Sequence, residues 1–308
     1  MNEIKIFAPA TVANISCGFD VLGCCLDGIG DEMIIRKSSK KGVRITKIIG
    51  EKLPLETENN VAGVAALALL NKLNKEIDFG FEIEIYKNIK PGSGVGSSAA
   101  SAAGTVFAIN KLLDEPFSIL ELVEFSREGE RLACGSPIAD NVAPALFGGF
   151  TLVKSTNPLE IIQLPTLPDL YVVIIHPQIE IKTSDSRAVL PTTISLEIAT
   201  RQWANLGSLV HALHVENYEL FSASLVDFIV EPHRSKLIPD FDKVKDASVQ
   251  AGALGCGISG SGPSMFTFCK GSQVADNVSN AISDVYQRTQ IPYHVYTSKI
   301  NTQGVKII

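Results

Sequence analysis

The sequence has no cysteine pairs of the kind that bind metals or build a disulfide framework, and no long apolar run. Its six cysteines are scattered along the chain: Cys17, Cys24, Cys25, Cys134, Cys256 and Cys269. None belongs to a Cys-x-x-Cys motif, and the two adjacent cysteines are poorly placed to bridge each other, so we expect reduced, mostly buried thiols. No stretch approaches the ~20 apolar residues of a membrane span, and no charged N-terminal segment precedes an apolar run. We therefore expect a cytoplasmic protein.

The chain also lacks a strong excess of either charge. Its net charge is −6, and its basic residues gather only in a short cluster within residues 36–41. Nucleic acids and membranes are therefore unexpected partners. Histidine is scarce, with five residues in all, and none of them lies in a motif. We expect His211 and His214 to lie on a solvated face of a helix.

Two common nucleotide-binding signatures are missing as well. The phosphate loop of the large NTPase class requires Gly-Lys-Ser/Thr, and no Gly-Lys dipeptide occurs in this chain. The stretch 255–260 matches the spaced glycines of the dinucleotide fingerprint, but that fingerprint needs a strand before it and a helix after it. Here the pattern predicts a helix before and a strand after, which disfavours a nicotinamide site.

The length and composition predict a two-domain globular protein. The chain has 308 residues, of which 45% are hydrophobic and 19% charged, and domains usually have ~100 to 200 residues. Three prolines cluster where a boundary would fit: Pro158, Pro165 and Pro168. We therefore divide the chain into residues 1–160 and 161–308. Helices and hairpins occur in groups without regular strand-helix alternation, which favours α+β layers over a doubly wound parallel sheet.

Hydrophobic periodicity predicts the individual elements. Strands are expected at residues 3–7, 32–37, 43–49, 79–86, 150–154, 160–164, 171–176, 265–269 and 293–299, with a turn between the second and the third. Helices are expected at residues 60–73, 118–133, 194–215, 218–228, 241–253 and 273–288. Residues 8–20, 135–149 and 255–264 are expected to be loops or turns.

The most informative stretch runs from Ile89 to Ser101. Three glycines alternate within it, and Ser97 and Ser98 follow where a helix would begin. A helix N-terminus offers free N–H groups and a partial positive charge. A glycine-rich loop that leads into one therefore predicts an anion site, most often for phosphate.

Three motifs together resemble those of the GHMP small-molecule kinases, the superfamily of galactokinase, homoserine kinase, mevalonate kinase and phosphomevalonate kinase. Residues 91–100 are similar to the phosphate-binding motif, residues 9–20 to the N-terminal substrate motif, and residues 257–263 to the C-terminal glycine motif. Asn14 with residues 18–20, residues 140–144, and Thr183 with Arg187 resemble the homoserine kinase branch. The matches follow the family's order over nearly the whole chain.

The resemblance implies a fold, a reaction and partners. The fold has a ribosomal-protein-S5-like N-terminal half and a ferredoxin-like C-terminal half, and such proteins are usually homodimers. The implied reaction uses ATP and Mg²⁺ to phosphorylate the side-chain hydroxyl of L-homoserine, on the route to threonine.

For the nucleotide, the resemblance implies contacts from the glycine loop and from one residue ahead of it: Asn60, Pro91, Gly92, Ser93, Gly94, Val95, Gly96, Ser97 and Ser98. It implies Ser98 and Glu130 as the Mg²⁺ ligands, since one carboxylate, one hydroxyl and the phosphates suffice for this cation. Glu130 fits better than Glu128 because it lies ten residues before Asp140, as in the family. Asn60 fits a helix cap as well as it fits a nucleotide contact. Ser97 also fits a helix cap that makes no contact with the nucleotide.

For the acceptor, the resemblance implies a set of polar residues: Asn14, Asp20, Asp140, Thr183, Arg187, Arg234 and Gly260. The acids and Asn14 suit an ammonium and a hydroxyl, and the arginines suit a carboxylate, which a guanidinium binds through two hydrogen bonds. A surface ion pair is the alternative for each arginine. Asn141 stands where related kinases carry a catalytic Asp. An amide accepts no proton, so we expect direct attack on the γ-phosphate, with Asn141 orienting the hydroxyl.

One position departs from the family pattern. Homoserine kinases usually carry His two residues before the Asp of Asp-Asn-Val-Ala-Pro, and this chain has Ile138 there. Isoleucine neither donates a hydrogen bond nor titrates, so one substrate contact is missing or replaced. Two alternatives therefore stay open: a GHMP kinase for another small alcohol, and a weakly active relative that binds amino acid and nucleotide as a sensor.

Overall fold

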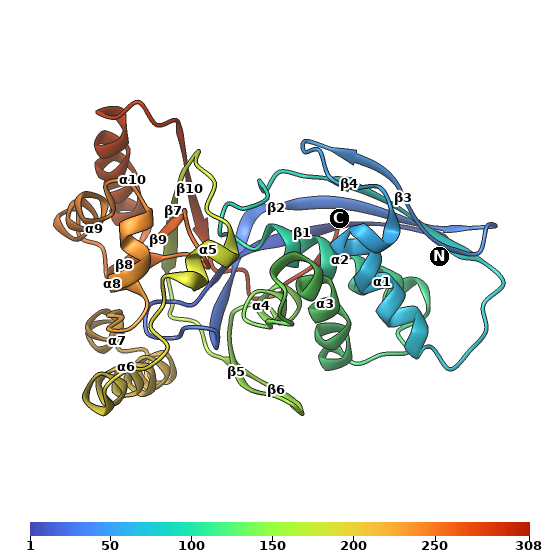
Figure 1. The fold of residues 1–308 in the computed structure, drawn as a ribbon, viewed down its shortest axis with the longest axis horizontal. Helices are drawn as coiled ribbons and strands as arrows, with labels where there is room; N and C mark the ends of the chain where they lie inside the picture. The colour runs from blue at the N-terminus through green and yellow to red at the C-terminus, as the bar shows by residue number, and fades with distance from the viewer.

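The computed structural model describes residues 1–308, arranged around two separate sheets (Figure 1). The larger sheet has seven strands in the order β11-β1-β2-β4-β3, with β5 paired to β2 and β6 paired to β5. Its strands are β1 (Glu3–Ala13), β2 (Leu22–Ser38), β3 (Gly42–Ile49), β4 (Gly80–Tyr86), β5 (Phe150–Thr156), β6 (Leu159–Leu164) and β11 (Lys306–Ile307). All pairs are antiparallel except β3 with β4.

Four helices cover one face of this sheet: α1 (Val61–Lys72), α2 (Ser97–Leu112), α3 (Ile119–Cys134) and α4 (Val142–Phe147). The central helix, α2, is rich in Ala, Gly and Ser, which lets it lie close to the strands. A Cβ at Gly104 would lie 2.7 Å from Met33 Sδ and 2.9 Å from Ile6 Cδ1, so a larger residue would displace these side chains. The capping box of Ser118 and Glu121 begins α3.

The smaller sheet has the strand order β10-β7-β9-β8. Its strands are β7 (Leu170–Pro177), β8 (Gly255–Ile258), β9 (Met265–Lys270) and β10 (Tyr293–Lys299), and all neighbours are antiparallel. In chain order this is fourth, first, third, second, the ferredoxin-like arrangement. The prediction of a two-domain α+β fold is therefore confirmed.

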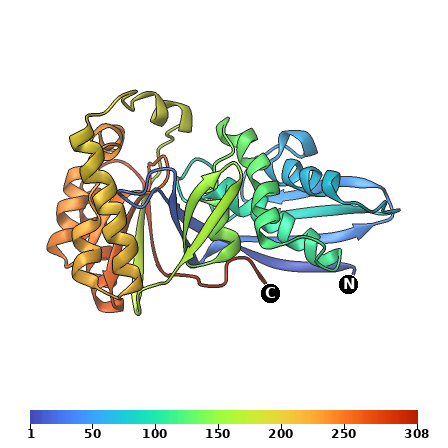
Figure 2. The same ribbon diagram turned by 90° about the horizontal axis from the view of Figure 1, so that it is seen from below.

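Helices cover both faces of the smaller sheet. The buried residues of α9 (Phe241–Gln250) and α10 (Ser272–Gln287) form a core with one set of strand residues. Those of α6 (Leu196–His214) and α7 (Tyr218–Ser224) join the larger core through Phe221 and Phe268. Figure 2 shows the two groups of helices at the end of the molecule away from the N-terminus. No helix of the chain is at once long and apolar enough to cross a bilayer.

Several predicted elements differ from the structure. Strand β1 continues to Ala13, so the predicted loop starts later. The strands at 32–37 and 43–49 do not pair with each other, because β4 lies between β2 and β3 and pairs with both. The helix predicted at 218–228 ends at Ser224, since the carboxylate of Asp227 accepts bonds from the N–H groups of residues 229–231 and stabilises a turn. Alternation marks a strand but does not identify its partner.

The two halves are interleaved along the chain. The predicted division after residue 160 falls inside β6, which belongs to the larger sheet. The chain also returns at its end, where β11 pairs with β1 and Ile300 forms a bridge with Leu26. The smaller sheet, within residues 170–299, therefore lies between the two stretches of chain that build the larger sheet.

Candidate active site

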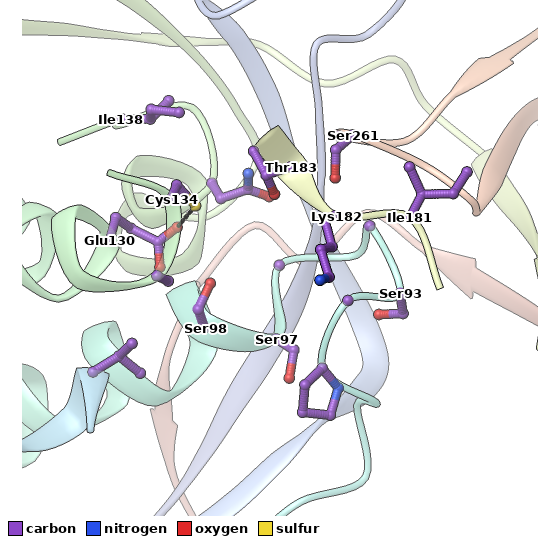
Figure 3. Close-up of a pocket in the computed structure, with 18 of the residues that line it drawn as sticks. Ser93, Ser97, Ser98, Glu130, Cys134, Ile138, Ile181, Lys182, Thr183 and Ser261 are labelled. Carbon is purple, nitrogen blue, oxygen red and sulfur yellow. Dashed lines mark hydrogen bonds between the residues drawn. The ribbon is translucent and has the colours of Figure 1, made fainter. Parts of the chain in front are cut away.

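A cavity of about 550 Å³ contains nearly all of the predicted site residues. Its walls are the glycine loop, the end of α3, the segment before α4, the loop after β1, the segment around α5 (Thr183–Ala188) and the turn after β8. Every predicted site residue lines it except Val95, which is buried behind the loop. Figure 3 shows how side chains from these separate segments point into one space.

The glycine loop rests on the C-terminal glycine turn. Gly94 has a φ of +84°, and its carbonyl accepts a hydrogen bond from the Ser259 hydroxyl at 2.7 Å. The Ser264 N–H donates to the Ser93 carbonyl at 3.2 Å. A Cβ on Gly94 would lie 2.6 Å from the Ser259 carbonyl oxygen. The phosphate-binding motif and the C-terminal glycine motif therefore need glycine, because their two backbones are in contact.

A buried ion pair between Lys87 and Asp31 ties the two ends of the glycine loop together. The Asp31 carboxylate accepts bonds from the N–H groups of Asn88 at 2.8 Å and Ile89 at 2.9 Å. The Lys87 ammonium donates to the Ser97 carbonyl at 2.9 Å. The Ser97 hydroxyl in turn donates to the Ile89 carbonyl at 2.8 Å, so its side chain holds the loop and does not cap α2. Lys87 also lines the cavity, and only its place just after a predicted strand could have indicated it.

Glu130 lies near the end of α3 and is 4% exposed. Its Oε1 atom has no hydrogen-bond partner, and Cys134 Sγ lies 3.8 Å from its Oε2 atom. Burial raises the pKa of Glu130 to about 7, and hydrogen bonding from Ser98 opposes the shift. Figure 3 shows Glu130 and Ser98 on the same side of the cavity. An unsatisfied buried carboxylate beside a hydroxyl fits a hard divalent cation.

The neighbouring candidate, Glu128, is excluded from the cavity. It pairs with Arg131 at 3.0 Å on the exposed face of α3. Asn60 caps α1 by accepting a bond from the Ala62 N–H at 3.0 Å, and it also lines the cavity, so its two interpretations are compatible. His211 and His214 are exposed on α6, as predicted.

The charged residues of the acceptor side pair with one another. Arg187 Nη2 lies 3.0 Å from both carboxylate oxygens of Asp20. Arg234 is 3% exposed and donates to the carbonyls of Ser186 at 3.0 Å and Gly260 at 3.1 Å. Asn14 connects the same parts, because its amide donates to the Gly260 carbonyl at 2.6 Å. Arg234 therefore forms no surface ion pair, whereas Arg187 pairs with Asp20 at the wall of the cavity, where both side chains are about one third exposed.

Asp140 is a second buried carboxylate, 3% exposed and directly before Asn141. Burial raises its pKa to about 7, and the negative charges of Asp20 and Glu130 add to the shift. Ile138, two residues earlier in the chain, also lines the cavity. It offers no group that could bond to a polar ligand there.

Further polar side chains line the cavity without having been predicted, among them Lys182 and Ser261. Lys182 precedes α5, forms no ion pair, and points toward the glycine loop in Figure 3. Ser261 lies in the C-terminal glycine turn. An exposed lysine in a loop has no distinguishing sequence pattern, and Ser261 lies within a motif whose glycines were the stronger signal.

Comparison with known proteins was made for both sequence and structure. The family model described as "GHMP kinases N terminal domain" matches residues 59–149, and "GHMP kinases C terminal" matches residues 199–288. A homoserine kinase of Chlorobium phaeobacteroides (strain BS1) is 43% identical over 100% of both chains. A homoserine kinase of Chlorobaculum tepidum is 43% identical over 100% of this chain and 99% of the relative. A crystal structure of homoserine kinase from Cytophaga hutchinsonii superimposes with a TM-score of 0.96 at 49% identity, covering 100% of this chain and 98% of that one.

Proposed function

The chain belongs to the homoserine kinase family of the GHMP kinases, and from this premise we propose that it transfers the γ-phosphoryl group of ATP to the side-chain hydroxyl of L-homoserine. The observation that carries the proposal is the content of a single cavity. It combines a glycine loop at a helix N-terminus with an Asp20–Arg187 pair that matches the two opposite charges of an amino acid.

On the donor side, the backbone N–H groups from Gly94 to Ser98 and the N-terminus of α2 bind the phosphates. Ser98 and Glu130 hold Mg²⁺, since the Oε1 atom of Glu130 is buried without a partner. When bound, this cation neutralises negative charge on the phosphates. The Asp31–Lys87 pair keeps the loop ends in place, so the cradle is formed before ATP arrives.

On the acceptor side, the charges of Asp20 and Arg187 find new partners when the substrate binds. The substrate ammonium lies against Asp20, Asp140 and Asn14, and its carboxylate against Arg187 and Arg234. Thr183 and Gly260 complete this wall. Arg234 is buried, and Arg187 lies at the same wall of the cavity, so the two charges favour a carboxylate over a neutral group, because an unpaired buried charge is costly.

The hydroxyl oxygen attacks the γ-phosphorus directly, the bond from that phosphorus to the β–γ bridging oxygen breaks, and ADP leaves. Asn141 orients the hydroxyl, and an amide takes up no proton, so the proton leaves late in a loose transition state. Asn141 positions the hydroxyl and contributes electrostatic stabilisation, and it forms no covalent bond.

The test is ADP release with a panel of acceptors: L-homoserine, L-threonine, L-serine, mevalonate and galactose. We expect turnover with L-homoserine and much less with the other four. No turnover with L-homoserine at millimolar concentration would contradict the proposal. Turnover with another member of the panel would instead favour the second candidate, a kinase for a different small alcohol, which Ile138 motivates.

We also propose a cytoplasmic homodimer. The cytoplasmic location is supported by the use of ATP and by the six cysteines, which are all free thiols, five of them buried.

The homodimer is supported by large apolar side chains that are exposed on α6, where Leu196 is 75% and Trp203 55% exposed. Light scattering coupled to gel filtration measures the mass in solution, and a monomer at micromolar concentration would contradict the dimer.

A further inference from the structure

Thr11 joins three parts of the site at one point. It lies in β1, is fully buried, and its hydroxyl donates to Asn141 Oδ1 at 2.7 Å. Its backbone N–H donates to the Val95 carbonyl at 3.2 Å. A Cβ on Gly96 would lie 2.1 Å from the Thr11 hydroxyl oxygen and 3.0 Å from Asn141 Oδ1, so glycine at this place makes room for the contact.

This contact determines which end of the Asn141 amide faces the cavity. The Thr11 hydroxyl is buried, and Asn141 Oδ1 is its one hydrogen-bond acceptor. If the amide were turned over, the Thr11 proton would have no acceptor, which is unfavourable in a buried place. Asn141 makes no capping bond at the start of α4, so no other group competes for Oδ1. Its NH₂ group therefore points away from Thr11 and donates to Asp140 Oδ1 at 3.5 Å, and both Asn141 and Asp140 line the cavity.

We propose that Thr11 is a positioning residue that holds the Asn141 amide with its NH₂ group toward the acceptor, so that Asn141 serves the reaction only as a hydrogen-bond donor. This inference rests on the proposed phosphoryl transfer and specifies the role of Asn141 within it. A donor binds a lone pair of the attacking hydroxyl or an oxygen of the transferring group. The hydroxyl proton then goes to an oxygen of the transferred phosphoryl group, which agrees with its late departure.

Three variants test the proposal. Thr11→Val removes the hydroxyl and keeps the shape, and we expect kcat to fall by about 10-fold to 100-fold, as for a misplaced catalytic group. KM for ATP and for the acceptor should change by less than about threefold, because a contact made in the transition state acts on kcat. Thr11→Ser keeps the hydroxyl and should restore most of the rate. Asn141→Asp can still accept from Thr11 but presents an acceptor to the cavity, and we expect its kcat to fall at least as far.

The matched control is Thr151→Val in β5. Thr151 is also fully buried in a strand, but its hydroxyl has no partner, so this variant should keep the wild-type kcat and melting temperature. A Thr11→Val enzyme with unchanged kcat would overturn the proposal, and so would an Asn141→Asp enzyme with unchanged or higher kcat. The comparison uses whichever acceptor of the panel the wild-type enzyme phosphorylates. Failure with L-homoserine therefore contradicts the proposed substrate without deciding the role of Thr11.

Discussion

The donor and acceptor sides of the cavity are formed by different kinds of group, backbone on the donor side and side chains on the acceptor side. In the proposed reaction, the ligand contacts on the donor side are backbone N–H groups, which are fixed by glycines with positive φ and by a buried ion pair that ties the loop ends. On the acceptor side, the contacts are side chains from separate segments, and in the ligand-free protein Asp20 and Arg187 neutralise each other. The donor side is therefore formed in advance, whereas the acceptor side exchanges partners when it binds.

This difference gives each side its own sensitivity to substitution. A backbone cradle fails when an added atom displaces the chain, and it responds weakly to charge. A side-chain site keeps its shape but loses affinity when one charge is removed. The predictions below separate the two, beginning with the largest effect.

Gly94→Ala should give the largest loss. The new Cβ would lie 2.6 Å from the Ser259 carbonyl oxygen and 2.8 Å from that of Gly262. The loop must shift away from the C-terminal turn, and a displacement of this size costs about 100-fold in kcat/KM. Both substrates should be affected, since the transferring group itself is misplaced. Steady-state kinetics with each substrate varied in turn measures the effect.

Gly92→Ala is the matched control for this prediction. Gly92 also has a positive φ, +73°, but the nearest atom to an added Cβ is Glu180 Cγ at 3.9 Å. The variant should therefore bear only the strain of the left-handed conformation, about 1–2 kcal/mol. If the two variants lose equal activity, backbone contact with the C-terminal turn does not set the loop.

Arg187→Met should act on the acceptor alone. We expect KM for L-homoserine to rise by about 30-fold. This is the lower end of the effect of removing one partner of a hydrogen-bonded charge pair, and we choose it because Arg187 is partly exposed. KM for ATP should change little. Arg131→Met removes a surface ion pair on α3 and should leave both constants at the wild-type values. A parallel rise in KM for ATP would show that the two sides are not separable.

Asp140 should make acceptor binding depend on pH. Its pKa is raised to about 7 by burial and by the charges of Asp20 and Glu130, so it is protonated below that pH. A substrate ammonium binds the ionised form, so KM for L-homoserine should rise about tenfold per pH unit below pH 7 and level off above it. The same shift favours the neutral acid in the folded state, so this group makes the free protein less stable as pH rises from about 4 to 7.

The pH profile is measured at saturating ATP and Mg²⁺, which removes the contribution of Glu130 to nucleotide binding. Asp140→Asn should flatten the dependence and raise KM at pH 8. A wild-type KM that is constant between pH 6 and pH 8 would exclude Asp140 from the ammonium site.

The donor side was more predictable from the sequence for the same reason that it is rigid. Gly92, Gly94 and Gly96 stand close together in one stretch, because all three have positive φ and because Gly94 and Gly96 also lie too close to neighbouring atoms for a Cβ. The roles of Lys87 and Thr11 were not predicted. Each depends on a partner that lies far away in the sequence, and a single Lys or Thr in or near a strand has no distinctive pattern.

The same limit applies to the fold. Helix α3 was predicted almost to its ends, since its cap and its apolar face are local features. The parallel pairing of β3 with β4 was missed because the sequence of a strand does not show which other strands lie beside it in the sheet. Family resemblance supplied what local patterns lack, and it brought Asp20, Asp140 and Arg187 together before their contacts were seen.

The smallest effect is expected from Ile138→His, which tests how complete the acceptor side is. Ile138 lines the cavity at the position where the family pattern led us to expect a histidine, and its side chain offers no hydrogen bond. A histidine there could add one neutral bond, worth about 0.5–1.5 kcal/mol, so KM for L-homoserine should fall by about twofold to tenfold. KM for ATP and the melting temperature serve as internal controls. An unchanged KM for L-homoserine would mean that Asp20, Asp140 and the two arginines already satisfy the substrate, and that the departure at this position leaves acceptor recognition intact.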